Sequence, residues 1–193
     1  MAEAAPRSAG APSVQVRDLR WEDFEPLREA YYLLYDERER GEPHGIHLFR
    51  DRPGLADEVR WFESLYRRAI EGEVVAVVGE VGGRAVGNCT VAPVGTTRNS
   101  EAGHVGVLGV LVHRDHRGRG VGTALLDAAI ARSRGKFELV RLSVFATNVR
   151  AKALYERRGF RTVGRIPRAY LRGTEYIDEE LMVLDLHDAP ARA

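Results

Sequence analysis

The segment Val110-Leu-Val-His-Arg-Asp-His-Arg-Gly-Arg-Gly-Val-Gly-Thr-Ala-Leu-Leu, residues 110–126, carries the strongest structural signal in the chain. An apolar strand is predicted to end here, and a helix is predicted to begin within a few residues. Glycines let the backbone of such a turn come close to a ligand, and the free N–H groups at a helix start favour an anion. Three arginines add positive charge: Arg114, Arg117 and Arg119. The segment therefore predicts an anion site, and a pyrophosphate fits it best.

Three phosphate-binding patterns can be compared with this turn. The Walker pattern GxxxxGK[ST] fails, because Ile130 stands where its first glycine belongs before Gly135-Lys136. The dinucleotide pattern GxGxxG begins at Gly118 but meets Thr123 at its last position. The pattern [Q/R]xxGx[G/A] is matched at all three of its positions, by Arg117, Gly120 and Gly122. The alternative is a tight strand–helix connection whose arginines are simply solvated.

The spacing of apolar residues along the rest of the chain predicts one α/β (α+β) domain over 13–187, with flexible tails at 1–12 and 188–193. Strands are expected at 14–17, 74–81, 84–91, 104–113, 139–145, 160–166 and 177–186, and helices at 21–35, 57–71, 121–134 and 148–158. The second helix is amphipathic, and its predicted buried side carries Val59, Phe62, Leu65, Tyr66 and Ile70. A hairpin-rich first half and an alternating second half favour a mixed sheet with helices on both faces.

The glycine-rich turn and its surroundings resemble the GNAT superfamily of acyl-CoA N-acyltransferases. The resemblance covers residues 14–186 in element order and is specific in 107–134 and 139–160. It implies a mostly antiparallel sheet whose strands splay around a CoA site. It also implies that the backbone of Leu111 and Val112 pairs with the pantetheine arm and polarises the thioester carbonyl. The residues implied to hold the CoA pyrophosphate are Arg117, Gly118, Arg119, Gly120, Val121, Gly122 and Thr123.

Residues 142–160, Leu-Ser-Val-Phe-Ala-Thr-Asn-Val-Arg-Ala-Lys-Ala-Leu-Tyr-Glu-Arg-Arg-Gly-Phe, match the second signature of that family. Asn148 stands where a helix N-cap belongs, and the resemblance implies that it also hydrogen-bonds the CoA arm. Tyr155 lies two helical turns later, on the same face. Thioester aminolysis expels a thiolate, so a phenol near the sulfur is a suitable general acid, and the resemblance assigns this role to Tyr155. The alternative is a core aromatic beside Leu154 and Phe160.

The base of the reaction is less clearly marked. Many relatives carry a Glu on the strand before the turn, but the predicted strand 104–113 has no acidic residue inside it. The nearest titratable groups are His104, whose pKa suits proton transfer, and Glu101 just before it. Their alternatives are an exposed strand end and a loop charge. Glu37 and Glu39, placed after the first helix, are expected either to attract a cationic amine or to form a solvated helix end.

Other side chains with reactive or ligating groups are expected to be structural. Cys89 lies in the middle of a strand with nothing to lower its pKa, so direct transfer in a ternary complex is expected, without an acyl-enzyme. His113 and His116 have no third ligand nearby, so no metal is expected. Tyr170 and Tyr176 are expected either to line the acceptor site or to pack across two strands.

Composition narrows the class of protein further. The 193 residues include 29 Lys+Arg, of which 27 are Arg, and 28 Asp+Glu, so the formal net charge is +1. This balance does not favour a nucleic-acid binder, which needs a dominant basic face. No apolar run approaches the roughly 20 residues of a membrane helix. The start of the chain has no apolar segment typical of a secretory signal, so a cytoplasmic location is expected.

The sequence therefore predicts an N-acetyltransferase that moves an acetyl group from acetyl-CoA to a primary amine. A protein Lys side chain or N-terminus is the favoured acceptor, and a polyamine, an amino acid or an antibiotic is the small-molecule alternative. The amine acceptor is the expected partner, no nucleic acid or membrane is expected, and a homodimer stays open. Two rivals are a non-catalytic CoA-binding sensor on the same fold and a nucleotide-binding α/β domain.

Overall fold

The computed structural model describes residues 13–42, 45–95 and 97–187, so the predicted tails lie outside the described residues. Within these ranges seven strands form one sheet: β1 (Gln15–Asp18), β2 (Val75–Val81), β3 (Arg84–Pro93), β4 (Val105–Val112), β5 (Leu139–Phe145), β6 (Arg161–Arg172) and β7 (Glu175–Asp185). Their order is β1-β2-β3-β4-β5-β7-β6. Neighbours are antiparallel except for the parallel pair β4 and β5. The predicted mixed, mostly antiparallel sheet is confirmed.

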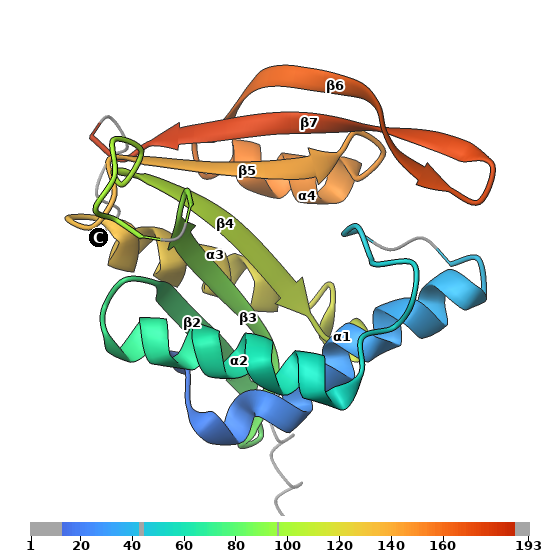
Figure 1. Ribbon diagram of the computed structural model, residues 1–193, viewed down its shortest axis with the longest axis horizontal. Coiled ribbons are helices and arrows are strands. Elements are labelled where there is room, and N and C mark those ends of the chain that lie inside the picture. The colour runs from blue at the N-terminus through green and yellow to red at the C-terminus, as the bar shows by residue number, and fades with distance from the viewer. Residues whose placement is uncertain (1–12, 43–44, 96, 188–193) are drawn as a thin grey trace, which may run out of the picture.

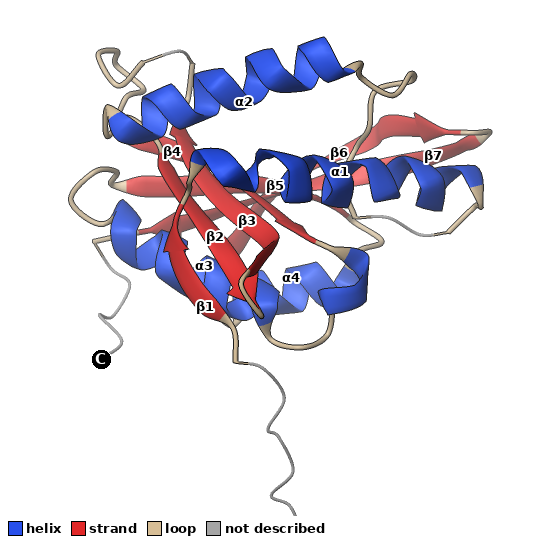
Figure 2. Cartoon of the chain, turned by 90° about the horizontal axis from the view of Figure 1, so that it is seen from below, coloured by secondary structure: helices blue, strands red, loops and turns tan. Residues whose placement is uncertain are grey.

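Four α-helices cover the two faces of this sheet in the described ranges. They are α1 (Phe24–Glu39), α2 (Leu55–Ile70), α3 (Val121–Ser133) and α4 (Val149–Glu156), and short 3-10 turns η1 (Trp21–Asp23) and η2 (Arg114–His116) precede α1 and α3. Figure 2 shows α1 and α2 over one face and α3 and α4 over the other, as predicted. The first helix was predicted to end at residue 35, but it continues to Glu39, and Glu37 in this extra turn is buried.

The sheet has an apolar core on each face. Along β2, Val75 and Val77 pack into the core under α3, whereas Ala76 and Val78 pack into the core under α1 and α2. Successive side chains of a strand point to opposite faces, so a strand covered on both sides has to be apolar throughout. The uninterrupted apolar run of β2 therefore follows from its inner position, whereas β4 buries mainly one face.

The buried side of α2 differs from the predicted one. Phe62 is 1% exposed, as expected, but Val59 is 38% exposed and Ile70 is 71% exposed. Glu58 takes a buried position instead, one residue before Val59 and one helical turn before Phe62. The prediction was wrong for Val59 and Ile70 because it placed the apolar stripe by side-chain type alone. The true inner face is rotated so that it includes an acid.

The parallel strands β4 and β5 separate soon after they meet. They pair only at Val105 with Leu139, Gly106 with Val140 and Val107 with Arg141, and Figure 1 shows them diverging beyond that point. From residue 108 to 112, β4 pairs with β3 on one side and has no strand among the described residues on the other. This confirms the predicted splay, and it leaves backbone donors and acceptors of β4 open to a ligand.

Candidate active site

The glycine-rich turn between β4 and α3 presents a row of free backbone donors. Gly118 and Gly120 adopt left-handed φ angles of +83° and +85°, and Gly120 is the N-cap of α3. The backbone N–H groups of residues 118–120 donate to no carbonyl oxygen of the described chain. The first N–H groups of α3 have no partner within the helix either. The turn therefore has the donor set of an anion site at the positive end of a helix dipole.

Two of the three arginines expected to supply charge at this turn are engaged elsewhere. Arg117 donates from Nη1 to both carboxylate oxygens of Glu37, at 2.9 and 3.1 Å, and from Nε to the carbonyl of Val112 at 3.1 Å. Arg114 lies 4.0 Å from Glu37 and 3.4 Å from Glu42. Glu37 is 2% exposed, so it is neither a solvated helix end nor free to receive an amine. These side chains instead join the turn to α1.

The positive charge next to the turn comes from other arginines. Arg119 is exposed, and the guanidinium of Arg150 on α4 lies against Gly118, where an added Cβ would be 3.1 Å from its Nη2 atom. Neither side chain forms an ion pair with any residue that the structure describes. Arg119 and Arg150 are therefore the cations available to an anion bound here.

Asn148 and Tyr155 both lie where the second signature placed them. The Asn148 side chain caps α4 by accepting from the N–H of Ala151 at 3.2 Å. Tyr155 is 7% exposed and packs edge-on against Phe160, with ring centroids 5.8 Å apart. Burial, with a smaller contribution from nearby Cys89, raises the pKa of Tyr155 well above its usual value. Its phenol therefore stays protonated throughout the neutral range.

Tyr155 lies close to the place where β4 and β5 separate. Its neighbour Cys89 lies on β3 directly opposite Val110 of β4, so Tyr155 packs behind the opened segment of β4. Its hydroxyl has no hydrogen-bond partner within the described ranges and is not among their fully enclosed polar atoms. The side chain is thus a core aromatic and, in addition, has a free proton donor.

A cavity of about 590 Å³ lies between α1, α2 and the sheet. Its floor is β4 from residue 107 to 111, of which 108–111 belong to the opened segment, with Asn88 and Thr90 of β3 and Ser143 of β5 beside it. The helices and the loop between them supply aromatic walls: Phe24, Tyr31, His47, Phe49, Trp61 and Phe62. Leu111 reaches the cavity, whereas Val112 does not. This cavity was not predicted, because its walls come from six separate segments.

The cavity has one carboxylate without a partner. Glu58 is 6% exposed, lines the cavity, and forms no hydrogen bond or ion pair with the described residues. Burial raises the pKa of its carboxyl, while the nearby Arg28 guanidinium acts in the opposite direction. Asp57 also lines the cavity but is exposed and bonded to Arg60 at 2.6 Å. The only sequence signal for Glu58 was its spacing of one helical turn from Phe62.

The two residues proposed as bases lie away from this cavity. His104 and Glu101 are both exposed, in the turn that precedes β4, at the end where β4 and β5 are still paired. At about 3.3 Å per residue, His104 is about 13 Å along the strand from Leu108, where the opening begins. The structure does not bring either side chain to the cavity, and their role as base has no geometric support.

The remaining reactive side chains have structural surroundings. Cys89 is fully buried, and burial raises the pKa of its thiol. His113 accepts the N–H of Asp115 at the start of η2, and no group of three metal-ligating side chains occurs in the described ranges. Tyr170 stacks on His47 with centroids 5.3 Å apart, and Tyr176 lies under the Arg168 guanidinium. Neither tyrosine lines the cavity.

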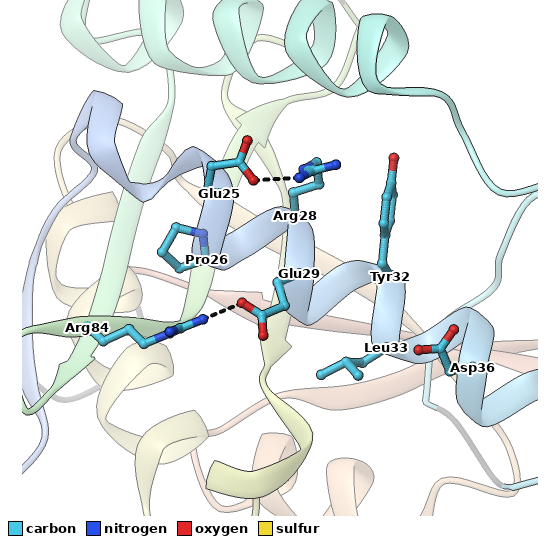
Figure 3. A pocket seen from close by; sticks show the side chains of 8 residues that line it. All are labelled: Glu25, Pro26, Arg28, Glu29, Tyr32, Leu33, Asp36 and Arg84. Carbon is cyan, nitrogen blue, oxygen red and sulfur yellow. Dashed lines mark hydrogen bonds and ion pairs between the residues drawn. The ribbon is translucent and has the colours of Figure 1, made fainter.

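A second hollow, of about 470 Å³, runs along the outer side of α1 (Figure 3). Its charged side chains face one another across the helix surface, where Glu25 pairs with Arg28 and Glu29 pairs with Arg84. It does not reach β4 or the glycine-rich turn. This hollow is therefore a surface groove whose charged side chains form ion pairs with one another. The cavity on the other side of α1 is the candidate acceptor site.

The fold and site define an acyl-CoA-dependent N-acetyltransferase, and the comparisons with known proteins agree. The model of the Acetyltransferase (GNAT) family matches residues 13–160. The L-methionine sulfoximine/L-methionine sulfone acetyltransferases of Pseudomonas aeruginosa and Pseudomonas paraeruginosa are 30% identical to this chain over 135 residues, which cover 68% of this chain and 74% of theirs. The chain belongs to the GNAT acetyltransferase family, and acetyl-CoA is its acyl donor.

Solved structures share the fold at lower identity. The ribosomal-protein-alanine N-acetyltransferase of Brucella melitensis has a TM-score of 0.74 at 23% identity, covering 89% of this chain and 99% of that one. A GNAT superfamily phosphinothricin acetyltransferase from Sinorhizobium meliloti, in complex with acetyl-CoA, has a TM-score of 0.74 at 18% identity, covering 93% of this chain and 92% of that one. No helix in the described ranges is both long and apolar enough to cross a membrane.

Proposed function

We propose that this chain acetylates the primary amine of a small molecule, and that the acceptor is an α-amino acid or a compound of that type. The observation that carries the proposal is the cavity between α1, α2 and the sheet, whose floor is the opened segment of β4. A cavity of about 590 Å³ with aromatic walls suits a small ligand better than an extended peptide. The curated relatives named above act on methionine derivatives, so they do not support the protein amine that the sequence favoured.

The charges around the cavity fit a zwitterionic acceptor. Glu58 and Asp57 lie on the α2 side and favour an ammonium group. Arg28 on α1 pairs through Nη2 with Glu25, but its buried Nε has no hydrogen-bond partner among the described residues and favours a carboxylate. The aromatic side chains between them fit an apolar or polarisable side chain of the acceptor. An acceptor with both an ammonium and a carboxylate group would therefore interact with more of the charged side chains of the cavity than a polyamine, which has no carboxylate to bind Arg28.

The donor half of the proposal uses the opened strand and the turn. Residues 118–123 would hold the CoA pyrophosphate through free backbone N–H groups, with Arg119 and Arg150 adding charge, whereas the Arg117 N–H already donates to the carbonyl of Arg114. The opened backbone of Leu111 and Val112 would pair with the pantetheine arm, and Asn148 would add a hydrogen bond. These groups fit the donor because the turn has free backbone N–H groups and β4 has no described strand partner there on the side of β5, although the Val112 carbonyl already accepts from Arg117 Nε.

Tyr155 would act as the general acid that protonates the departing thiolate sulfur. Its buried phenol keeps its proton at neutral pH and packs behind the segment of β4 that forms the cavity floor. Cys89 is fully enclosed and has a raised pKa, so it is a poor nucleophile. Direct attack of the amine on the thioester, with both substrates bound together, is therefore the proposed route.

A screen of acceptors with acetyl-CoA, followed by release of the free thiol, tests this function. The panel contains L-methionine sulfoximine, L-methionine sulfone, phosphinothricin, their carboxyl methyl esters, spermidine, and peptides with a Lys or a free N-terminus. We expect the highest kcat/KM for a free amino acid and a loss for its ester. Turnover of peptides alone would overturn the small-molecule acceptor, and thermal stabilisation by CoA without any turnover would favour the sensor.

A further inference from the structure

The geometry points to Glu58 as the group that takes the proton from the acceptor ammonium. This inference rests on the proposed function and assigns its missing base. The strand that forms the cavity floor carries no acidic side chain, and the two residues before it, Glu101 and His104, lie at its closed end. Helix α2 supplies a carboxylate on the opposite wall instead. We infer that the base of this enzyme comes from the helix and not from the strand.

Glu58 differs from the other buried acids of the described chain in forming no hydrogen bond or ion pair, although the Arg28 guanidinium lies near enough to lower its pKa. Asp23 is held by Arg17 at 2.8 Å, and Glu180 is held by Lys152 at 2.8 Å. Both carboxylate oxygens of Glu37 accept from Nη1 of Arg117. A buried carboxylate costs free energy unless it is paired or bonded, so an unpaired one on a cavity wall calls for an occupant that supplies the missing donor. An ammonium group is the occupant that this reaction provides.

The surroundings of Glu58 favour proton transfer. Arg28 and Tyr31 face the cavity from α1, His47 faces it from the loop, and Asp57 is the other acid on α2. The sheet contributes only non-titrating polar side chains, from Asn88, Thr90 and Ser143. Burial is the main cause of the raised pKa of the Glu58 carboxyl, and a carboxylate with a raised pKa is a stronger base. Asp57 is exposed and already engaged by Arg60, so it is the weaker candidate.

The proposed step conserves protons and electrons. The acceptor ammonium gives one proton to the Glu58 carboxylate, and the freed nitrogen lone pair forms the C–N bond as the C–S bond breaks. Tyr155 gives its phenolic proton to the departing sulfur, and the second nitrogen proton restores the phenol. Glu58 then releases its proton to solvent, so that each turnover yields the amide, the free thiol and one proton.

The test compares two isosteric substitutions on the same helix. Glu58→Gln removes the carboxylate on the cavity wall, and Glu63→Gln removes an exposed one away from it. With the best acceptor of the screen, we expect Glu58→Gln to lower kcat/KM roughly 100-fold at pH 7, because one general base contributes 10²–10⁴-fold. The loss should shrink towards pH 9.5, where more of the amine is already neutral. The affinity for acetyl-CoA and the rate of Glu63→Gln should stay at the wild-type value.

The outcomes separate this role from a structural one and from failure of the proposed function. A Glu58→Gln enzyme within threefold of wild type at pH 7, or an equal loss at every pH, would overturn the proposal. Glu58→Asp retracts the carboxylate by one methylene, so it should retain the acidic limb of the pH profile at a reduced rate. If the Gln variant does not fold, a wild-type rate from the Asp variant overturns the proposal. Wild-type turnover of peptides alone contradicts the small-molecule acceptor, and Glu58 is then tested with that peptide.

Discussion

The donor turn and the acceptor cavity lie on either side of the opened β4 strand, but the chain builds them in different ways. The turn is one continuous segment, residues 117–123, whose function depends on backbone conformation. The cavity is lined by α1, α2, the loop between them and three strands. Local backbone geometry follows from neighbouring residues, whereas a cavity wall depends on packing between distant ones. The same difference should separate the effects of substitutions in the two regions.

The two regions are nevertheless joined by an ion pair whose acidic member is buried. Glu37 lies on α1, the helix that forms a wall of the cavity, and its carboxylate is held by Arg117 of the donor turn. Arg117 also bonds the carbonyl of Val112 at the end of β4. A substitution of Glu37 or Arg117 should therefore affect both the cavity and the donor turn. The effect is expected to pass through this charged pair and not through apolar packing.

The largest effect is expected at Gly120, where only backbone geometry is involved. Gly120→Glu places a side chain at a φ of +85° and adds a negative charge at the N-cap of α3. We expect the Kd for CoA to rise at least 100-fold, or about 3 kcal/mol, as measured by isothermal titration. Nothing lies within 4 Å of an added Cβ there, so Gly120→Ala should mainly reduce stability, by about 1–2 kcal/mol. Unchanged CoA affinity in the Glu variant would make the turn a simple connector.

Tyr155→Phe tests whether the Tyr155 hydroxyl takes part in the reaction, in addition to the packing of its ring behind the opened segment of β4. It keeps the ring that packs against Phe160 and removes only the hydroxyl, so stability and CoA affinity should hold. We expect kcat to fall roughly 10- to 1000-fold, since a general acid contributes 10²–10⁴-fold. Because burial raises its pKa above the usual value of a tyrosine, wild-type activity should not decline through loss of this proton below pH 10. An unchanged kcat would leave Tyr155 as a core aromatic only.

Glu37→Gln tests the link between the two regions. It leaves the Arg117 guanidinium without its counter-charge in a site where Glu37 is 2% exposed. The Arg117 side chain is 34% exposed, so solvent screens part of the loss, and we expect the free energy of unfolding to fall by about 2 kcal/mol. Urea unfolding measures this change in the free energy of unfolding. The exposed Glu39→Gln on the same helix is the control, and equal stability of the two variants would show that the pair contributes little.

The fold was predictable where one segment determines its own structure. The strand–turn–helix unit at β4 and α3 and the Gly82-Gly83 hairpin follow from local glycines and apolar runs. Strand β6 was predicted too short, because it runs on through Pro167 to Arg172, whereas β7 was predicted to within two residues of its observed bounds. Register shifts occur in β6 between Ile166 and Tyr170, which accommodate a proline inside an edge strand. Pairing with β7 thus overrode the local signal.

The site was predictable on the donor side and not on the acceptor side. The family signatures placed the turn, Asn148 and Tyr155. An acid on an amphipathic helix is normally solvated, so the spacing of Glu58 from Phe62 was too weak a signal to predict its burial. Sequence also could not show that Arg117 pairs with Glu37, 80 positions away, and so is withdrawn from ligand binding. Both errors concern where side chains of distant segments meet.

The smallest expected effect belongs to Arg150, which reaches the donor turn from a different element. Arg150→Met removes the guanidinium that lies against Gly118 and keeps the length of the side chain. We expect the Kd for acetyl-CoA to rise about tenfold, or about 1.4 kcal/mol, and to depend less on salt. The matched control is Arg157→Met, exposed at the other end of α4. With a truncated donor such as the acetyl thioester of N-acetylcysteamine, which lacks the pyrophosphate, Arg150→Met and wild type should react equally. A tenfold loss with that donor too would mean that Arg150 supports the fold of the turn and not the phosphate.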